Sequence, residues 1–184
     1  MDVCFGCIVE GQGESSAVPI LLRRITEAVD QSIRVHTVIA RHSRNALVRQ
    51  GELERAVQAL SYRLQGNSGI LILLDSDDDQ PCVLGPDLLQ RAQRARPDVR
   101  IRLVLATREY ETWFLAAAES LAGKSGLRPD LVRPPEPEIM DDTQPMLSRI
   151  GESFRLRWFE MQKGGWLATW NSTKHTVQHV TSQH

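Results

Sequence analysis

Residues 70–81 read ILILLDSDDDQP, and this stretch decides the fold. Its five apolar residues at 70–74 predict a short strand that is covered on both faces, as in a parallel sheet. Four aspartates follow between positions 75 and 79, a segment that we call the acidic loop. Their charges repel one another, so an ordered loop needs a compensating partner. The alternatives are a metal ion, arginine side chains or water alone.

The composition of the chain predicts one globular domain, with a small appendage at most. The chain has 184 residues, of which 41% are hydrophobic and 24% are charged, so a packed core is feasible. A net charge of −1 gives no general attraction to nucleic acid or to a membrane surface. Only three of the 22 basic residues are lysine. An excess of arginine suits phosphate binding, and GC-rich coding gives the same bias.

Targeting signals and a disulfide framework are not expected. No apolar run approaches the roughly 20 residues that span a bilayer as a helix. The N-terminus lacks the features of a secretory signal, and three cysteines are an odd number. We therefore expect a cytoplasmic, reduced protein without a membrane partner.

Strand-like and helix-like segments alternate along the first 121 residues. Strands are expected at 3–9, 34–40, 70–74 and 99–106, and helices at 18–29, 51–64, 86–96 and 109–121. The first helix has Ser15 or Ser16 as its N-cap, the third has Pro86 in its first turn, and Gly123 closes the fourth. Apolar and charged residues alternate in the first part of the last strand, which suits a position nearer the edge of the sheet. This order predicts an α/β fold with a Rossmann-like, mostly parallel sheet of about four strands flanked by helices.

The chain changes character after the fourth predicted helix. We expect residues 1–127 to form the α/β domain and residues 128–184 to form a separate, irregular part. Five prolines between positions 129 and 145 exclude regular structure over most of that segment. One helix is expected within 145–161, and the tail at 164–184 has little apolar periodicity.

Carboxylates follow two of the predicted strands. Glu10 comes directly after the first strand and Asp75 directly after the third. Ligands of open α/β sheets bind beyond the carboxyl ends of the strands, so Glu10, Asp75 and Asp77 converge if these strands lie close together. In an extended segment, Asp75 and Asp77 would point the same way. Such a group suits a hard cation and phosphoryl chemistry, and the alternative is a solvated acidic loop.

Further charged residues are expected at the same edge of the sheet. Glu109 and Glu111 open the fourth helix, either as a second metal position or as acids that favour the helix dipole. Arg41, His42 and Arg44 follow the second strand. They could neutralise the acidic loop or bind a substrate phosphate, or they could form a solvated basic loop.

Competing motifs fit the sequence less well. Cys4 and Cys7 form a CxxC pair, but their odd spacing within a strand sends them to opposite faces and predicts core thiols. Gly11-Gln12-Gly13 lacks the third glycine of a dinucleotide fingerprint, since Ser16 stands there.

The motifs taken together resemble the TOPRIM domain of topoisomerases, primases, recombination proteins and overcoming-lysogenization-defect (OLD) nucleases. Two stretches carry the likeness, CIVEGQGE with Glu10 and ILLDSDDD with Asp75 and Asp77. More narrowly, the chain resembles a bacterial TOPRIM-like family of unknown function. That likeness rests on VEGQGESSAVPILLRRI, GELERAVQAL, ILLDSDDDQPCVLGPDLL and REYETWFLAAAESL, and it covers about residues 1 to 130.

The resemblance implies a metal site at the acidic loop. It places Mg²⁺ or Mn²⁺ at Asp75 and Asp77, with Glu10 as general acid/base or as a further ligand. The lesser candidates are Glu14, Asp79, Glu109 and Glu111.

The resemblance also implies an activity and partners. The expected activity is phosphodiester hydrolysis by a nuclease component of a bacterial defence or repair system, phage defence included. Nucleic acid is the expected substrate. Because the chain has no ATPase motif, a separate ATPase subunit is an expected partner, and a homo-oligomer stays open. The alternative is a non-catalytic module that docks a partner through its acidic edge.

Overall fold

The computed structural model of the chain describes residues 1–107, 112–123 and 129–135. Its centre is a four-stranded, all-parallel sheet with the strand order β2-β1-β3-β4. The strands are β1 (Asp2–Val9), β2 (Arg34–Arg41), β3 (Ser68–Asp75) and β4 (Arg100–Ala106). The predicted α/β fold is confirmed, and β4 lies at the sheet edge as expected.

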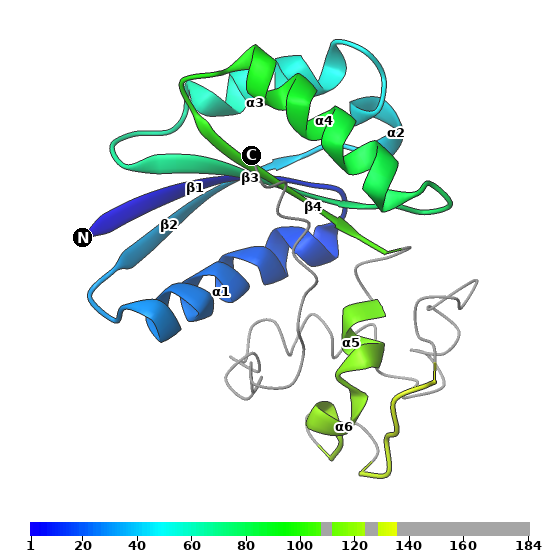
Figure 1. Cartoon of the computed structure of the whole chain (residues 1–184). Coiled ribbons are helices and arrows are strands. Elements are labelled where there is room, and N and C mark those ends of the chain that lie inside the picture. Colours follow the sequence, from blue (N-terminus) through cyan, green and yellow to red (C-terminus); the bar gives the residue numbers. More distant parts are fainter. Residues whose placement is uncertain (108–111, 124–128, 136–184) are drawn as a thin grey trace.

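Helices cover both faces of the sheet (Figure 1). One face carries the long helix α1, and the other carries α3 and α4 with the short α2 at one end. The helices of this sandwich are α1 (Gln12–Val29), α2 (Arg44–Leu47), α3 (Glu52–Ser61) and α4 (Pro81–Ala95). Two short helices, α5 (Thr112–Ala116) and α6 (Ala118–Leu121), follow β4 on the α1 side.

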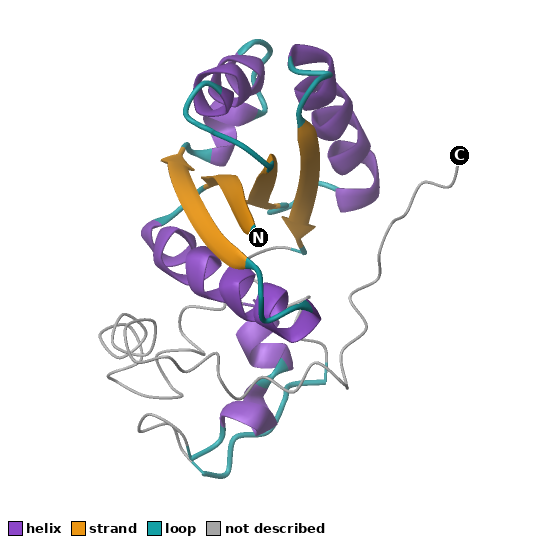
Figure 2. Ribbon diagram, turned by 90° about the vertical axis from the view of Figure 1, so that its left-hand side faces the viewer, coloured by secondary structure: helices purple, strands orange, loops and turns teal. Residues whose placement is uncertain are grey.

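The strand alternation sorts the core into two layers, one on each side of the sheet. Figure 2 shows the helices that cover these two sides. Ile8, Ile72 and Leu74 are fully buried in the layer under α3 and α4. Cys7 and Val9 are fully buried in the layer under α1. Each large apolar side chain that is buried in this way stabilises the fold by about 1.5–3 kcal/mol before entropy costs. Of the two cysteines predicted as core thiols, Cys7 is buried in the core, whereas Cys4 is only partly buried.

One glycine lets α3 lie close to the sheet. A Cβ atom at Gly6 would stand 3.0 Å from the Leu60 side chain and 3.1 Å from that of Leu64. Leu60 is only 1% exposed and has little room to move. The absence of a side chain in the centre of β1 therefore sets the distance between helix and sheet.

The first helix begins earlier than expected, and neither Ser15 nor Ser16 caps it. α1 begins at Gln12, with Gly11 in the N-cap position. The Glu14 carboxylate accepts a 2.9 Å hydrogen bond from the Gly11 amide. The serine hydroxyls instead donate back to carbonyl groups one turn earlier in the chain. The predicted serine caps are wrong because Glu14, which precedes both serines, already satisfies the backbone amide at the start of the helix.

The third predicted helix also begins earlier. α4 begins at Pro81, and Pro86 lies inside the helix rather than in its first turn. A proline at the first helical position loses no intrahelical hydrogen bond, which makes Pro81 the better start. The acidic loop therefore ends close to the N-terminus of α4. The short helix α2 was not predicted, since four residues carry too little periodicity to detect.

The predicted fourth helix at 109–121 is divided in its described part. α5 ends at Ala116, and Ala117 leaves the helical region before α6 begins. Gly123 has φ = 71°, but the chain already leaves the helical conformation at Ala122, which has ψ = 134°, so Gly123 follows the end of this helical segment rather than closing it.

The proline-rich part is described only at residues 129–135, and this piece contains neither helix nor strand, as expected. The predicted domain boundary at 127 and the expected helix within 145–161 lie outside the described residues. Among the described helices, none is both long and apolar enough to cross a membrane.

Candidate functional site

The topology brings the predicted carboxylates to one edge of the sheet. β1 lies between β2 and β3, and the three strands run parallel. Glu10 directly follows β1, while Asp75 is the last residue of β3. The site prediction depended on the first and third strands lying side by side, and the structure meets this condition.

Glu10 has one bound and one unbound carboxylate oxygen. Its Oε1 accepts a 3.0 Å hydrogen bond from the backbone amide of Arg44. Its Oε2 is buried and has no hydrogen-bond partner among the described residues. Burial raises the pKa of Glu10 above its usual value, and the negative charges of Asp77 and Glu14 add to the rise. The hydrogen bond and the charge of Arg44 oppose it.

The acidic loop is a tight turn rather than an extended segment. The buried Ser76 donates its amide to the Ala106 carbonyl at 2.9 Å, which continues the contact with β4. Asp79 then donates its amide to the Ser76 carbonyl at 2.9 Å. Asp77 has φ = 48°, in the left-handed region. The chain is therefore not extended from Asp75 to Asp77, so the condition under which the two side chains could point the same way is not met.

Arg44 supplies the positive charge that the acidic loop requires. Its side chain is only 10% exposed, and its Nη1 lies 3.4 Å from an Asp77 oxygen. Its Nη2 is paired with the Asp79 carboxylate. The same guanidinium donates to the carbonyl groups of Asp75 at 3.1 Å and Ser76 at 3.2 Å. Arginine is thus the partner of the loop within the described residues, which is one of the alternatives that the sequence left open.

The other predicted site residues lie nearby in different roles. Arg41 is exposed at the end of β2, and its guanidinium donates to the Gln12 side chain. His42 is partly buried, and its amide donates to the Val9 carbonyl at 3.0 Å. Glu14 is buried and holds the first turn of α1. Glu109 and Glu111 lie outside the described residues.

The residues present can be compared with the needs of a divalent cation. No group of three or more His, Cys, Asp or Glu side chains forms a metal cluster within 1–107, 112–123 and 129–135. Mg²⁺, however, binds through one or two carboxylates together with water and substrate phosphate. The unbound Oε2 of Glu10 and the half-exposed carboxylate of Asp77 are oxygen donors of that kind. The donor set therefore fits a cation that keeps part of its water shell.

One residue of the site was missed from the sequence. The backbone of Ser76 joins the acidic loop to both β4 and Arg44. No local pattern identifies Ser76, because its partners are distant in the sequence.

Comparison with known proteins identifies a family. The sequence pattern of a family described as "Domain of unknown function (DUF4276)" matches residues 9–165. No curated protein and no solved structure matches the chain. The matched range includes Glu10, Arg44 and the acidic loop, so the whole candidate site lies within it.

Proposed function

This chain belongs to the DUF4276 family, and we propose that it is a Mg²⁺- or Mn²⁺-dependent phosphoryl-transfer protein that acts on nucleic acid. The buried Oε2 of Glu10, which lacks a hydrogen-bond partner at the carboxyl edge of the sheet, carries the proposal. A buried carboxylate oxygen without a partner is costly, and a cation or a transferred proton would offset that cost. The most specific form of the proposal is a TOPRIM-type nuclease in a bacterial defence or repair system.

Each residue has a role in this proposal. Glu10 and Asp77, with Asp75 beside them, would hold the cation, and Glu10 is also placed to take a proton from an attacking water. A bound divalent cation supplies an activated water and neutralises charge on the phosphate. Arg44 keeps the acidic loop turned toward Glu10. Arg41 ends β2 and His42 follows it, so both lie at the same edge and would contact a substrate phosphate.

The arrangement of elements is the reason for proposing a TOPRIM relationship. A Glu after the first strand faces an acidic loop after the neighbouring strand, and both lie at the carboxyl edge of a parallel sheet. Nucleases of the OLD type combine such a domain with an ATPase. A separate ATPase subunit is therefore the partner that we propose for this chain.

A second candidate function has an observation of its own. Arg44 already pairs with Asp77 and Asp79, so part of the negative charge of the acidic loop is compensated without a metal. A protein with this arrangement could keep the fold as a non-catalytic module that docks a basic partner through the exposed sides of its aspartates. Such a complex would weaken with salt, because the exposed charges are screened.

Calorimetric titration with Mn²⁺ and Mg²⁺ separates the two functions. The variants are Glu10→Gln and the double variant Asp75→Asn/Asp77→Asn. Asp2→Asn/Asp98→Asn is the matched control, since it removes the same number of charges at the amino ends of the strands, opposite the candidate site. The proposal expects binding by the wild type and the control, and none by the site variants.

A nuclease assay on single-stranded and double-stranded DNA and RNA follows with the same proteins. Metal-dependent cleavage that both site variants lose supports the proposal. Binding or cleavage that survives in both site variants would rule it out, and absent binding in the wild type would favour the docking module.

A further inference from the structure

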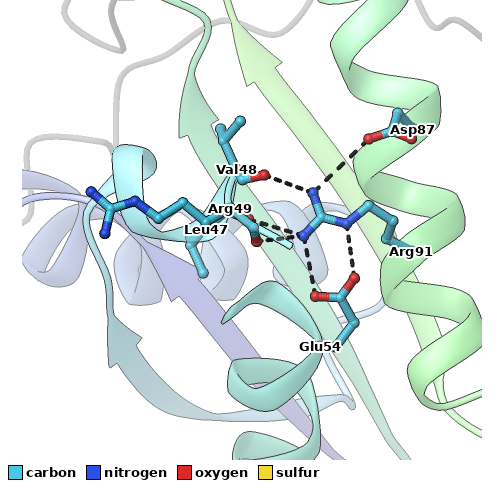
Figure 3. A network of polar contacts seen from close by, with 6 residues as sticks. All are labelled: Leu47, Val48, Arg49, Glu54, Asp87 and Arg91. Carbon is cyan, nitrogen blue, oxygen red and sulfur yellow. Dashed lines mark hydrogen bonds and ion pairs between the residues drawn. The ribbon is translucent and has the colours of Figure 1, made fainter. Parts of the chain in front are cut away.

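Arg91 lies within α4, away from the carboxylates of the candidate site, and only 16% of its side chain is exposed. Its Nε and Nη2 donate to the two oxygens of Glu54 on α3, at 2.8 and 3.1 Å (Figure 3). Asp87, one turn earlier on α4, lies 4.0 Å from its Nη1. The two-pronged bond with Glu54 fixes the plane of the guanidinium between α3 and α4.

The remaining donors of Arg91 bind the end of α2. Nη1 donates to the Val48 carbonyl at 2.9 Å, and Nη2 donates to the carbonyls of Arg49 at 2.7 Å and Leu47 at 3.4 Å (Figure 3). The last carbonyl groups of a helix have no acceptor role within the helix itself. One partly buried guanidinium therefore caps α2 and the turn that follows it.

The beginning of the same short helix belongs to the candidate site. Arg44 is the first residue of α2, and its amide and side chain hold Glu10 and the acidic loop. A helix of four residues has too few hydrogen bonds to be stable alone, so contacts at its two ends must set its position. Arg91 and the fully buried side chain of Leu47 provide the contacts at one end, and Glu10 with the acidic loop provides the contact at the other.

We propose that Arg91 is a positioning residue of the candidate site, which acts through α2 to keep Arg44 against Glu10 and the acidic loop. Arginine suits this task because one planar fork can bind a carboxylate and several carbonyl groups together, whereas lysine offers a single point of contact. The inference deepens the proposed function, on which it depends for the meaning of the site. The contact path from Arg91 to Arg44 is independent of any metal.

Hydrogen exchange at the Arg44 amide tests this path. The variant is Arg91→Met/Glu54→Gln, which keeps much of the apolar stem and removes the Glu54 charge together with that of Arg91, while the remaining carboxylate of Asp87 is 62% exposed to water. We expect about a tenfold loss of protection at the Arg44 amide, because the end of α2 is released. The amides of Ile72 and Leu73 in the central strand β3 should keep their protection.

Arg96→Met/Asp98→Asn is the matched control. Arg96 ends the same helix and makes its own two-pronged bond with Asp98, at 2.8 and 2.7 Å, but it makes no described contact with α2. This variant should leave the Arg44 amide protected. Unchanged protection in the Arg91 variant would overturn the inference, and so would a loss shared equally by Arg44 and β3, since that would mean only global destabilisation.

The test also keeps the two proposals apart. If the wild type binds no Mn²⁺, the proposed function fails while the exchange result still decides the role of Arg91. If the wild type binds Mn²⁺ and the Arg91 variant keeps full protection at Arg44, the inference fails while the proposed function stands.

Discussion

The backbone amide of Arg44 donates a 3.0 Å hydrogen bond to Oε1 of Glu10, although 34 positions separate the two residues. The guanidinium of the same arginine pairs with Asp77 and Asp79 of the acidic loop. One residue thus joins the segment after β1 to the segment after β3. The relative position of the predicted catalytic Glu and the predicted metal ligands therefore depends on Arg44.

Arg44→Ala should destabilise the fold by about 1–3 kcal/mol, because Asp77 and Asp79 lose their partner and buried carbonyl groups lose a donor. The lower end of that range applies if the loss of the ion pairs contributes little, because the two aspartates are about half exposed to water. Urea denaturation measures the change. Arg55→Ala is the control, since its pair with Glu52 is exposed and should contribute less than about 0.5 kcal/mol. Equal effects of the two substitutions would contradict the role given to Arg44.

Glu10→Gln should stabilise the protein at neutral pH. Burial and the charges of Asp77 and Glu14 raise the pKa of Glu10 above its usual 4.5, so the fold favours the protonated carboxyl. That stabilisation is present below the usual pKa and is lost as the pH rises through the folded value. The free energy of unfolding should therefore be larger for the variant than for the wild type at pH 7, and this difference should shrink toward pH 4. An advantage that does not change with pH would count against this assignment.

Cys7 and Cys82 should differ strongly in reactivity. Burial raises the pKa of the Cys7 thiol to about 12, whereas Cys82 is exposed. The thiolate is the reactive form, so iodoacetamide at pH 8 should modify Cys82 and spare Cys7 in the folded protein. Mass spectrometry of the peptides measures this, with unfolded protein as the control in which both react. The protonated Cys7 thiol also stabilises the fold below about pH 9, an effect lost as the pH rises toward 12.

Gly6→Ala and Gly85→Ala should shift stability in opposite directions. The added methyl at Gly6 would stand 3.0 Å from the buried Leu60 and should cost about 1–3 kcal/mol. At Gly85 the nearest atom, on Leu105, is 3.6 Å away, which is an ordinary contact. Alanine there removes a helical glycine and should stabilise α4 by up to about 1 kcal/mol. Thermal unfolding of both variants checks the pair, and a loss at both positions would mean that crowding at Gly6 is not the cause.

Local patterns were sufficient for the order of elements. The apolar run at 70–74 predicted a buried strand, and the alternation of strands and helices predicted a parallel sheet. Both follow from short-range periodicity, which a window of a few residues contains. Helix starts were less predictable, since Glu14 and Pro81 compete with nearby serines and with Pro86 for the same role.

The location of the candidate site was predictable from the sequence, but the contacts between its residues were not. The rule that ligands bind at the carboxyl edge placed Glu10 and the acidic loop together, and the structure brings these segments to that edge. The left-handed turn at Asp77 was not foreseen, because a buried arginine from another element stabilises it.

By itself, the sequence determined the alternation of strands and helices and placed the carboxylates after two of the strands, because periodicity and the order of elements along the chain are local properties. The tertiary structure decided that β1 and β3 lie side by side, which brings these carboxylates to one edge. Only the tertiary structure decided that Arg44 is the partner of the acidic loop and that Arg91 holds the far end of α2. The physical reason is distance along the chain. A guanidinium can satisfy carboxylates and carbonyl groups wherever folding brings them together, and nothing in its own sequence neighbourhood specifies which ones.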